Sequence, residues 1–297
     1  MSIINLQNGL LSARVSTAGG TLRDYSWMMD GSKIALLRPT QDGANASSSA
    51  CYPLVPFGNR VRNNHFTFEG RDYRLRPNTA SDPHYLHGDG WQAEWSILSR
   101  TSSEVQIGFH HQEADTPYRY DTRQIITLSS EGLTLHMSVE NTGIHALPFG
   151  LGWHPYFPLT AQTTLFAPAR HFWTETEGFL PGQRTDIPAD LDFSRPLSLP
   201  RRWVNNGLED WSGEALIAWP EKRASLRLTA DATVRHAFVF IPDTDFIPAY
   251  RHDYFCFEPM SHIANGHNLP DLGDLKILQP GETLAASIRL QPQSYPQ

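Results

Sequence analysis

Short stretches in which apolar and polar residues alternate recur along the chain, and a period of two is typical of β-strands with one buried face. The clearest is LTLHMSV at 133–139, where every second residue is apolar. Helical periodicity is weak, and only residues around 209–215 and 269–273 suggest short helices. The pattern therefore predicts an all-β fold.

The turn content agrees with this prediction. Residues 65–75 predict a β-hairpin whose turn is Glu69-Gly70. The 22 prolines and 21 glycines suit many turns, and no linker, repeat or abrupt change of composition divides the 297 residues. We expect one domain, residues 1–297, folded as a large antiparallel β-sandwich. Further strands are expected at 105–109, 226–228, 236–241, 254–257 and 284–290.

Charge and cysteine content indicate a soluble cytoplasmic protein. The net charge of −7 disfavours general binding to nucleic acid or to an anionic membrane surface. The two cysteines, Cys51 and Cys256, are expected to be reduced thiols, and the N-terminal residues lack the features of a secretory signal. Residues 141–169 have no charged side chain but contain four prolines, so we expect them to enter the core or line a cleft.

Four unusual clusters stand out against the β pattern. Asn59 and Arg60 follow a proline-rich turn, His87 precedes glycine, His154 lies among aromatic residues, and Glu258 ends an apolar strand. Each could be structural: a solvated turn, a loop, a packed histidine or an ion pair. The four clusters are PFGNRVR at 56–62, HYLHGDGW at 84–91, GWHPYFP at 152–158 and YFCFEPMSH at 254–262.

Glu258 is the strongest catalytic candidate taken alone. A carboxylate after Tyr-Phe-Cys-Phe must either reach the surface or be held by partners. A carboxyl group beside apolar side chains tends to have a raised pKa, as a general base acting near neutrality requires. Other chemistries lack support, because the sequence has no HExxH, CxxC, GxSxG, GxGxxG or P-loop motif. We therefore expect neither a metal nor a redox cofactor.

Together the four clusters resemble the aldose 1-epimerase (galactose mutarotase-like) family, especially its bacterial subgroup with GWHPYF and CFEPMSH-type motifs. The resemblance extends from STAGGTLRDY near the N-terminus to LQPGETLAASIRL near the C-terminus. It implies a single-domain β-supersandwich with a sugar cleft on a concave sheet face. It also implies an isomerase that interconverts the α and β anomers of an aldohexose without a cofactor.

The resemblance also implies roles for individual residues. Glu258 is expected to be the general base that takes the anomeric hydroxyl proton, and His154 the general acid that protonates the ring oxygen. Arg60 and His87 are expected to bind the sugar, and Asn59 is a further substrate-binding candidate. We expect the acid and the base to lie on opposite sides of the pyranose.

One substrate-binding position departs from the family's pattern. Counting back from Trp211, the family's Asp that holds a ring hydroxyl is replaced by Asn205. An amide carries no charge and can donate as well as accept a hydrogen bond. We therefore expect Asn205 to bind the sugar with less discrimination between glucose and galactose.

Two alternatives stay open from the sequence. The same fold could act on a hexose 6-phosphate, with Arg62, Arg71 and Arg74 as candidate phosphate ligands. It could also be a non-catalytic carbohydrate-binding or sugar-sensing protein. The sequence does not distinguish a monomer from a homodimer. Candidates for stacking on the sugar are Trp91, Trp153 and Tyr156.

Overall fold

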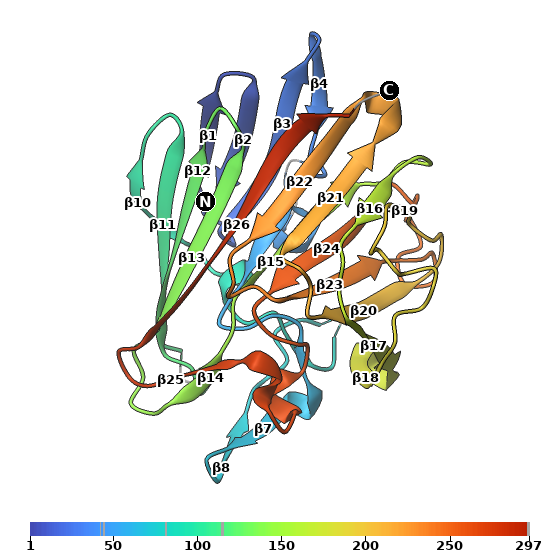
Figure 1. Ribbon diagram of the computed structural model, residues 1–297. Helices are drawn as coiled ribbons and strands as arrows, with labels where there is room; N and C mark the ends of the chain where they lie inside the picture. Colours follow the sequence, from blue (N-terminus) through green and yellow to red (C-terminus); the bar gives the residue numbers. More distant parts are fainter. Residues whose placement is uncertain (42, 44, 81, 114–115, 296–297) are drawn as a thin grey trace.

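The structure, a computed structural model, describes residues 1–41, 43, 45–80, 82–113 and 116–295. This part of the chain forms two large antiparallel sheets of 11 and 9 strands and three two-stranded ribbons (Figure 1). Its helices are short 3-10 turns, and no described helix has the length and apolar character needed to cross a membrane. The predicted all-β, antiparallel architecture is confirmed.

The larger sheet joins segments from all parts of the sequence. Strands β5, β15 and β24 are neighbours near its centre, although they are far apart along the chain. From one edge its strands are β1 (Ile3–Asn8), β2 (Leu11–Ser16), β3 (Thr21–Met29), β5 (Cys51–Leu54), β15 (Gly152–Pro158), β24 (Tyr254–Met260), β23 (His236–Ile241), β20 (Val204–Glu209), β17 (His171–Thr176) and β18 (Leu180–Thr185), with β4 (Ser32–Ala35) paired to β3.

The smaller sheet is also antiparallel throughout. Its strands are β10 (Ser96–Arg100), β11 (Glu104–His111), β12 (Tyr120–Leu128), β13 (Leu133–Asn141), β26 (Thr283–Ser294), β22 (Ala224–Ala230), β21 (Glu214–Trp219), β16 (Thr164–Phe166) and β19 (Leu197–Ser198). The ribbons pair β6 (Arg60–Val61) with β9 (Tyr85–Leu86), β7 (His65–Phe68) with β8 (Arg71–Arg74), and β14 (Leu147–Phe149) with β25 (Lys276–Leu278). The β7–β8 ribbon is the predicted hairpin.

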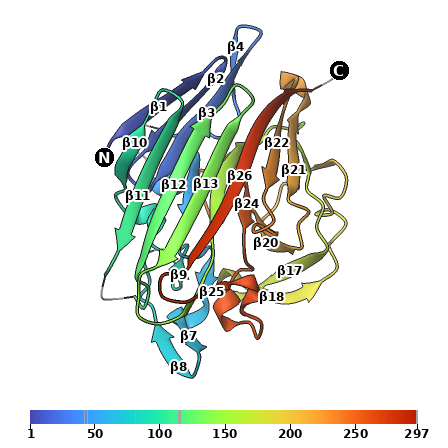
Figure 2. The same cartoon turned by 60° about the vertical axis from the view of Figure 1, so that its left-hand side comes forward.

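The two sheets pack face to face, and the smaller one lies in front in Figure 2. The Tyr25 hydroxyl on β3 donates to the Leu290 carbonyl oxygen on β26 at 3.1 Å, which ties the sheets together. Buried apolar side chains from both sheets form one core cluster that includes Phe257 of β24 and Leu228 of β22. This packing leaves the other face of the larger sheet free to carry a site.

Alternation along β15 and β24 decides which residues that outer face presents. Trp153 and Phe157 belong to the core between the sheets, so His154 and Tyr156 point to the outer face. The same alternation on β24 places Glu258 on the outer face. The uncharged stretch that includes β15 therefore enters the core and lines the outer face, as the sequence predicted.

The two predicted helices are wrong. Around 209–215, β20 ends at Glu209 and β21 begins at Glu214, with Asp210 at φ 53° and Gly213 at φ 80° between them. Left-handed backbone at two nearby residues breaks a right-handed helix. At the second position only a 3-10 turn forms, and it covers Leu272–Asp274.

Candidate active site

A cavity of about 390 Å³ opens on the outer face of the larger sheet. All six residues that the sequence predicted for the site line this cavity, although they come from distant segments. The fold therefore brings the candidate residues together, while their roles stay predictions. The six residues are Asn59, Arg60, His87, His154, Asn205 and Glu258.

His154 and Glu258 lie opposite each other on neighbouring strands. The register of β15 against β24, in which Gly152 pairs with Met260, places His154 across from Glu258. His154 Nε2 lies 3.1 Å from Glu258 Oε1. A proline, which has no N–H to donate, follows each of the two residues, and the regular strand pairing is interrupted here.

The contact corrects one expectation from the sequence. Two side chains 3.1 Å apart leave no room for a pyranose between them, so the expected placement on opposite sides of the ring is wrong. The anomeric oxygen O1 and the ring oxygen O5 are both bonded to C1. An acid and a base in contact can therefore serve both oxygens from one side of the sugar.

Burial changes the protonation of both groups. The Glu258 and His154 side chains are 2% and 7% exposed. Burial raises the pKa of Glu258 to about 8, and the nearby charge of Arg60 opposes that rise. Burial lowers the pKa of His154 to about 3, and the charges of Arg38 and Arg60 act in the same direction. Over the intervening pH range the pair holds one proton, shared between a carboxyl oxygen and a ring nitrogen.

Aromatic rings hold the His154 imidazole in place. Tyr52 stacks on one side, with ring centroids 4.5 Å apart, and Tyr156 stacks at 4.8 Å. The Arg38 guanidinium carbon lies 3.8 Å from the centre of the Tyr156 ring and continues the stack. Among the described residues, His154 Nδ1 and Glu258 Oε2 are buried and have no hydrogen-bond partner, so the polar contact within the pair is the one between Nε2 and Oε1.

His87 is a neutral donor beside this pair. Its Nδ1 accepts a hydrogen bond from the Asn59 backbone N–H at 3.0 Å, so the ring proton belongs on Nε2. Burial holds the pKa of His87 well below its usual value, and the charges of His154 and Arg60 act in the same direction. The imidazole therefore offers an N–H to a sugar oxygen without carrying a charge.

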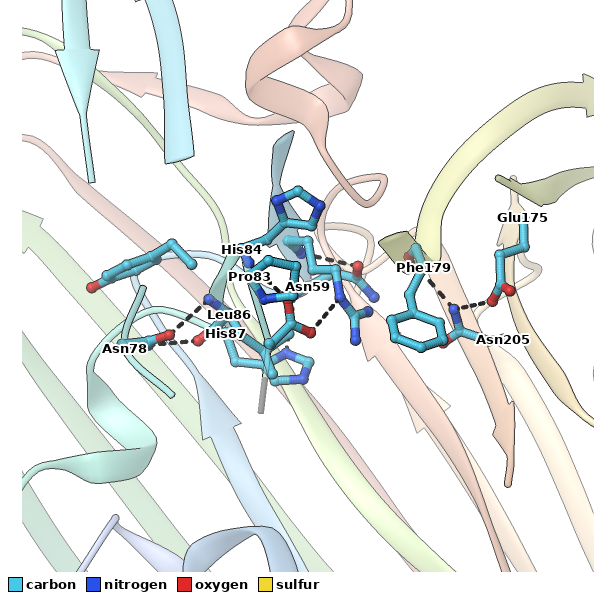
Figure 3. A network of polar contacts seen from close by, with 12 residues as sticks. Asn59, Asn78, Pro83, His84, Leu86, His87, Glu175, Phe179 and Asn205 are labelled. Atoms are coloured by element: carbon cyan, nitrogen blue, oxygen red, sulfur yellow. Dashed lines mark hydrogen bonds and ion pairs between the residues drawn. The ribbon is translucent and has the colours of Figure 1, made fainter. Parts of the chain in front are cut away.

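The loop around His87 is rigidly braced, as Figure 3 shows. The Asn78 amide nitrogen donates to the carbonyl oxygens of Leu86 and Gly88 at 2.8 and 2.9 Å. A Cβ at Gly88 would lie 2.2 Å from the Val55 carbonyl oxygen, so only glycine fits. The close approach of the two loops fixes where the His87 ring enters the cavity.

Arg60 is anchored by a buried ion pair. Its Nε lies 2.7 Å from Asp82 Oδ2, and the two side chains are 11% and 5% exposed. Asp82 Oδ1 accepts the backbone N–H of His84 at 2.9 Å, which fixes the carboxylate in turn. The guanidinium carbon also lies 5.2 Å from the centre of the Phe179 ring. These contacts hold the cation at the cavity wall.

Asn205 sits on the other side of the cavity in a network that the sequence did not reveal (Figure 3). Its side-chain Nδ2 donates to Glu175 Oε2 and, at 3.5 Å, to the Phe179 carbonyl oxygen. Glu175 also accepts the Trp203 indole N–H at 3.1 Å. The carboxylate absent at position 205 is therefore present one strand away, at Glu175 on β17.

The aromatic wall differs from the predicted one. Trp203, Phe240 and Phe246 line the cavity, and Trp203 contacts both phenyl rings. Of the three predicted stacking candidates, Tyr156 alone lines it, while Trp153 packs into the core and Trp91 lines a separate cavity. The arginines proposed for phosphate do not line it either: Arg62, Arg71 and Arg74 are exposed elsewhere.

The cationic side chains on the cavity wall are Arg38 and Arg60, within the part of the chain that the structure describes. No group of three or more His, Cys, Asp or Glu among these residues is arranged to hold a metal ion. Independence from metals and cofactors stays a prediction.

Comparisons with known proteins identify the family and the fold. The aldose 1-epimerase family matches residues 2–291. The Escherichia coli K12 protein YphB, described as uncharacterized, is 40% identical over 292 residues, covering 98% of this chain and 99% of YphB. A crystal structure of an Escherichia coli K12 protein provisionally called an aldose 1-epimerase is 39% identical, with a TM-score of 0.94 over 99% of both chains.

A galactose 1-epimerase structure from Lactobacillus acidophilus is 16% identical, with a TM-score of 0.80 over 99% of this chain and 95% of that one. At this identity the likeness shows the fold alone. The family match over nearly the whole sequence decides the assignment. This chain belongs to the aldose 1-epimerase family, whose fold and isomerase chemistry the resemblance predicted.

Proposed function

We propose that the chain is an aldose 1-epimerase that interconverts the α and β anomers of a free aldohexose. The contact of 3.1 Å between His154 Nε2 and Glu258 Oε1, on a cavity wall, carries the proposal. Such a pair can take one proton and give another at adjacent atoms. The name of the Lactobacillus acidophilus relative supports a hexose substrate. A cytoplasmic monomer or homodimer is part of the same proposal.

Ring opening moves two protons and no net charge. The proton of the resting pair first passes from Glu258 to His154 Nε2 across the 3.1 Å contact, and the resulting carboxylate takes the proton of the O1 hydroxyl, whose O–H electron pair forms the C1=O bond. The C1–O5 bond breaks, and O5 takes the proton of the His154 imidazolium at Nε2. The pair then consists of a carboxylic acid and a neutral imidazole, the form that burial favours.

Ring closure reverses these transfers after rotation about C1–C2. O5–H returns its proton to His154 while O5 attacks C1, and O1 takes the proton from Glu258. The pair holds one proton in each resting state, so the cycle needs no exchange with solvent. His87 Nε2–H and the Arg60 guanidinium are placed to donate to sugar oxygens whose charge changes in these steps.

Polarimetry of freshly dissolved α-glucose and α-galactose tests the proposal. Glu258→Gln keeps the shape and removes the base, so the catalysed rate should fall at least ~10²-fold. Glu221→Gln, at an exposed carboxylate outside the cavity, is the matched control and should retain activity. A folded Glu258→Gln protein with near-normal mutarotation would refute the assignment. Faster turnover of glucose 6-phosphate than of the free sugars would instead assign the activity to the phosphorylated sugar.

A further inference from the structure

The orientation of the Asn205 amide is determined by its neighbours. Glu175 Oε2 and the Phe179 carbonyl oxygen both contact one end of the amide, and neither can donate. That end must therefore be the NH₂ group, whose two hydrogens serve the two acceptors (Figure 3). Among the described residues no donor contacts Asn205 Oδ1, and Asn205 lines the cavity. The carbonyl oxygen is the end left for a ligand.

The partners of Asn205 are themselves fixed. Both carboxylate oxygens of Glu175 lie near the Trp203 indole nitrogen, at 3.2 and 3.1 Å. The pairing of β17 with β18 shifts register between Trp173 and Glu175, and such an irregularity redirects a side chain. Phe179 adopts φ 60°, which is rare for a bulky residue. One side-chain contact and two backbone irregularities thus fix the partners of one amide.

This arrangement corrects the expected behaviour of Asn205. The sequence predicted an amide able to donate or accept towards each sugar hydroxyl. In the structure Glu175 and Phe179 use its donors, and only an acceptor remains. The neutral amide then presents to the sugar the same hydrogen-bonding character as the aspartate found at this position in many family members.

We propose that Glu175 is a positioning residue that makes Asn205 an acceptor-only contact for a free sugar hydroxyl. The inference rests on the proposed sugar-binding site and adds a requirement on the substrate. The hydroxyl that meets Asn205 must donate, so an ether, a deoxy or a fluoro substituent at that carbon loses the hydrogen bond. Glu175 acts through Asn205 and does not itself line the cavity.

A pair of variants tests this clamp, by which we mean the contacts of the Asn205 amide with Glu175 and the Phe179 carbonyl oxygen. Asn205→Asp places a carboxylate against Glu175, so the two repel or share a proton, and KM at pH 7.5 should rise at least ~10-fold. In Asn205→Asp with Glu175→Gln, the new amide can donate to the new carboxylate. The double variant should therefore return to within about threefold of the wild-type KM. Glu177→Gln, an exposed acid two residues away, should change neither kcat nor KM.

A double variant no better than Asn205→Asp alone would overturn the inference. The substrate requirement is tested with glucose analogues that carry fluorine at one carbon each. One analogue should lose at least ~10-fold in kcat/KM with the wild type, and that penalty should vanish in Asn205→Ala. Penalties that are the same in both proteins at every carbon would contradict the acceptor role.

Calorimetric titration of sugar separates this inference from the proposed activity. If the wild type binds hexose but does not catalyse mutarotation, the proposed function fails. The same order of affinities, with Asn205→Asp weakest and the double variant restored, would still support the clamp. Catalysis by the wild type with no restoration in either measurement would refute the clamp alone.

Discussion

The imidazole of His154 lies flat against the ring of Tyr52, with centroids 4.5 Å apart and an interplanar angle of 23°. The two residues are direct partners in the register of β5 and β15, so strand pairing itself sets the stack. Because His154 Nδ1 has no hydrogen-bond partner among the described residues, the rings orient this imidazole. The stacked rings direct Nε2 to Glu258, and no carboxylate among the described residues accepts a hydrogen bond from Nδ1 on the other side of the imidazole.

We predict that the ring of Tyr52, and not its hydroxyl, matters for catalysis. Tyr52→Phe keeps the stack and should retain most of the mutarotation rate. Tyr52→Leu keeps an apolar side chain but loses the flat aromatic contact, and kcat should fall ~10-fold, a cost of about 1.4 kcal/mol, with little change in KM. Polarimetry with both variants provides the comparison. Equal rates for Leu and Phe would show that other contacts orient His154.

The pH dependence should report the single proton of the pair. As pH rises through about 8, Glu258 loses its proton, and a carboxylate with a neutral imidazole has a base but no acid. The catalysed kcat/KM, corrected for spontaneous mutarotation, should fall there and stay level from about pH 5 to 7.5. Arg60 opposes the rise in the Glu258 pKa, so Arg60→Met should move the fall to higher pH. A shift to lower pH would contradict this electrostatic account.

Much of the site could be predicted because its catalytic candidates lie in local patterns. GWHPYFP and YFCFEP are strands whose alternation separates core residues from His154 and Glu258. Strand order could not be predicted in this way, because a pairing such as β5 with β15 joins residues about a hundred positions apart. No periodicity records that neighbourhood.

The supporting residues were missed for a related reason. Glu175 stands in TETEG, which looks like a solvated charged segment, and its contact with Asn205 depends on an irregular strand pairing. His262 belongs to the CFEPMSH cluster, but its Nε2 accepts the Gly58 backbone N–H at 2.9 Å. It therefore braces the loop that carries Asn59 and Arg60. Contacts of this kind depend on tertiary structure and leave no local signal.

Metal removal should leave the activity unchanged. The proposed transfers use Glu258 and His154 alone, so extensive dialysis against EDTA should not alter the mutarotation rate. His154→Asn should abolish catalysis while the variant still binds hexose in a calorimetric titration. A chelated enzyme that is inactive and recovers with added zinc would require a different mechanism.

Glu258 should also make the wild-type protein less stable as the pH rises. In the unfolded chain its carboxyl group ionises near pH 4.5, whereas in the folded protein it stays protonated up to about pH 8. Unfolding in this range releases a proton, so the unfolding free energy falls by about 1.4 kcal/mol per pH unit relative to a protein without the group. The stabilising contribution is complete below pH 4.5 and is lost as pH rises towards 8.

Glu258→Gln removes this ionisation and leaves the rest of the charge distribution in place. In urea unfolding at pH 5, 6, 7 and 8, the unfolding free energy of the variant relative to that of the wild type should rise with each step. This difference should level off above pH 8. His154 contributes with the opposite sign at lower pH, because burial lowers its pKa, but it is present in both proteins and largely cancels. For Glu221→Gln, at an exposed carboxylate, the unfolding free energy should change with pH as it does for the wild type. If that of Glu258→Gln also changes as in the wild type, Glu258 is already ionised in the folded protein, and the neutral resting pair is wrong.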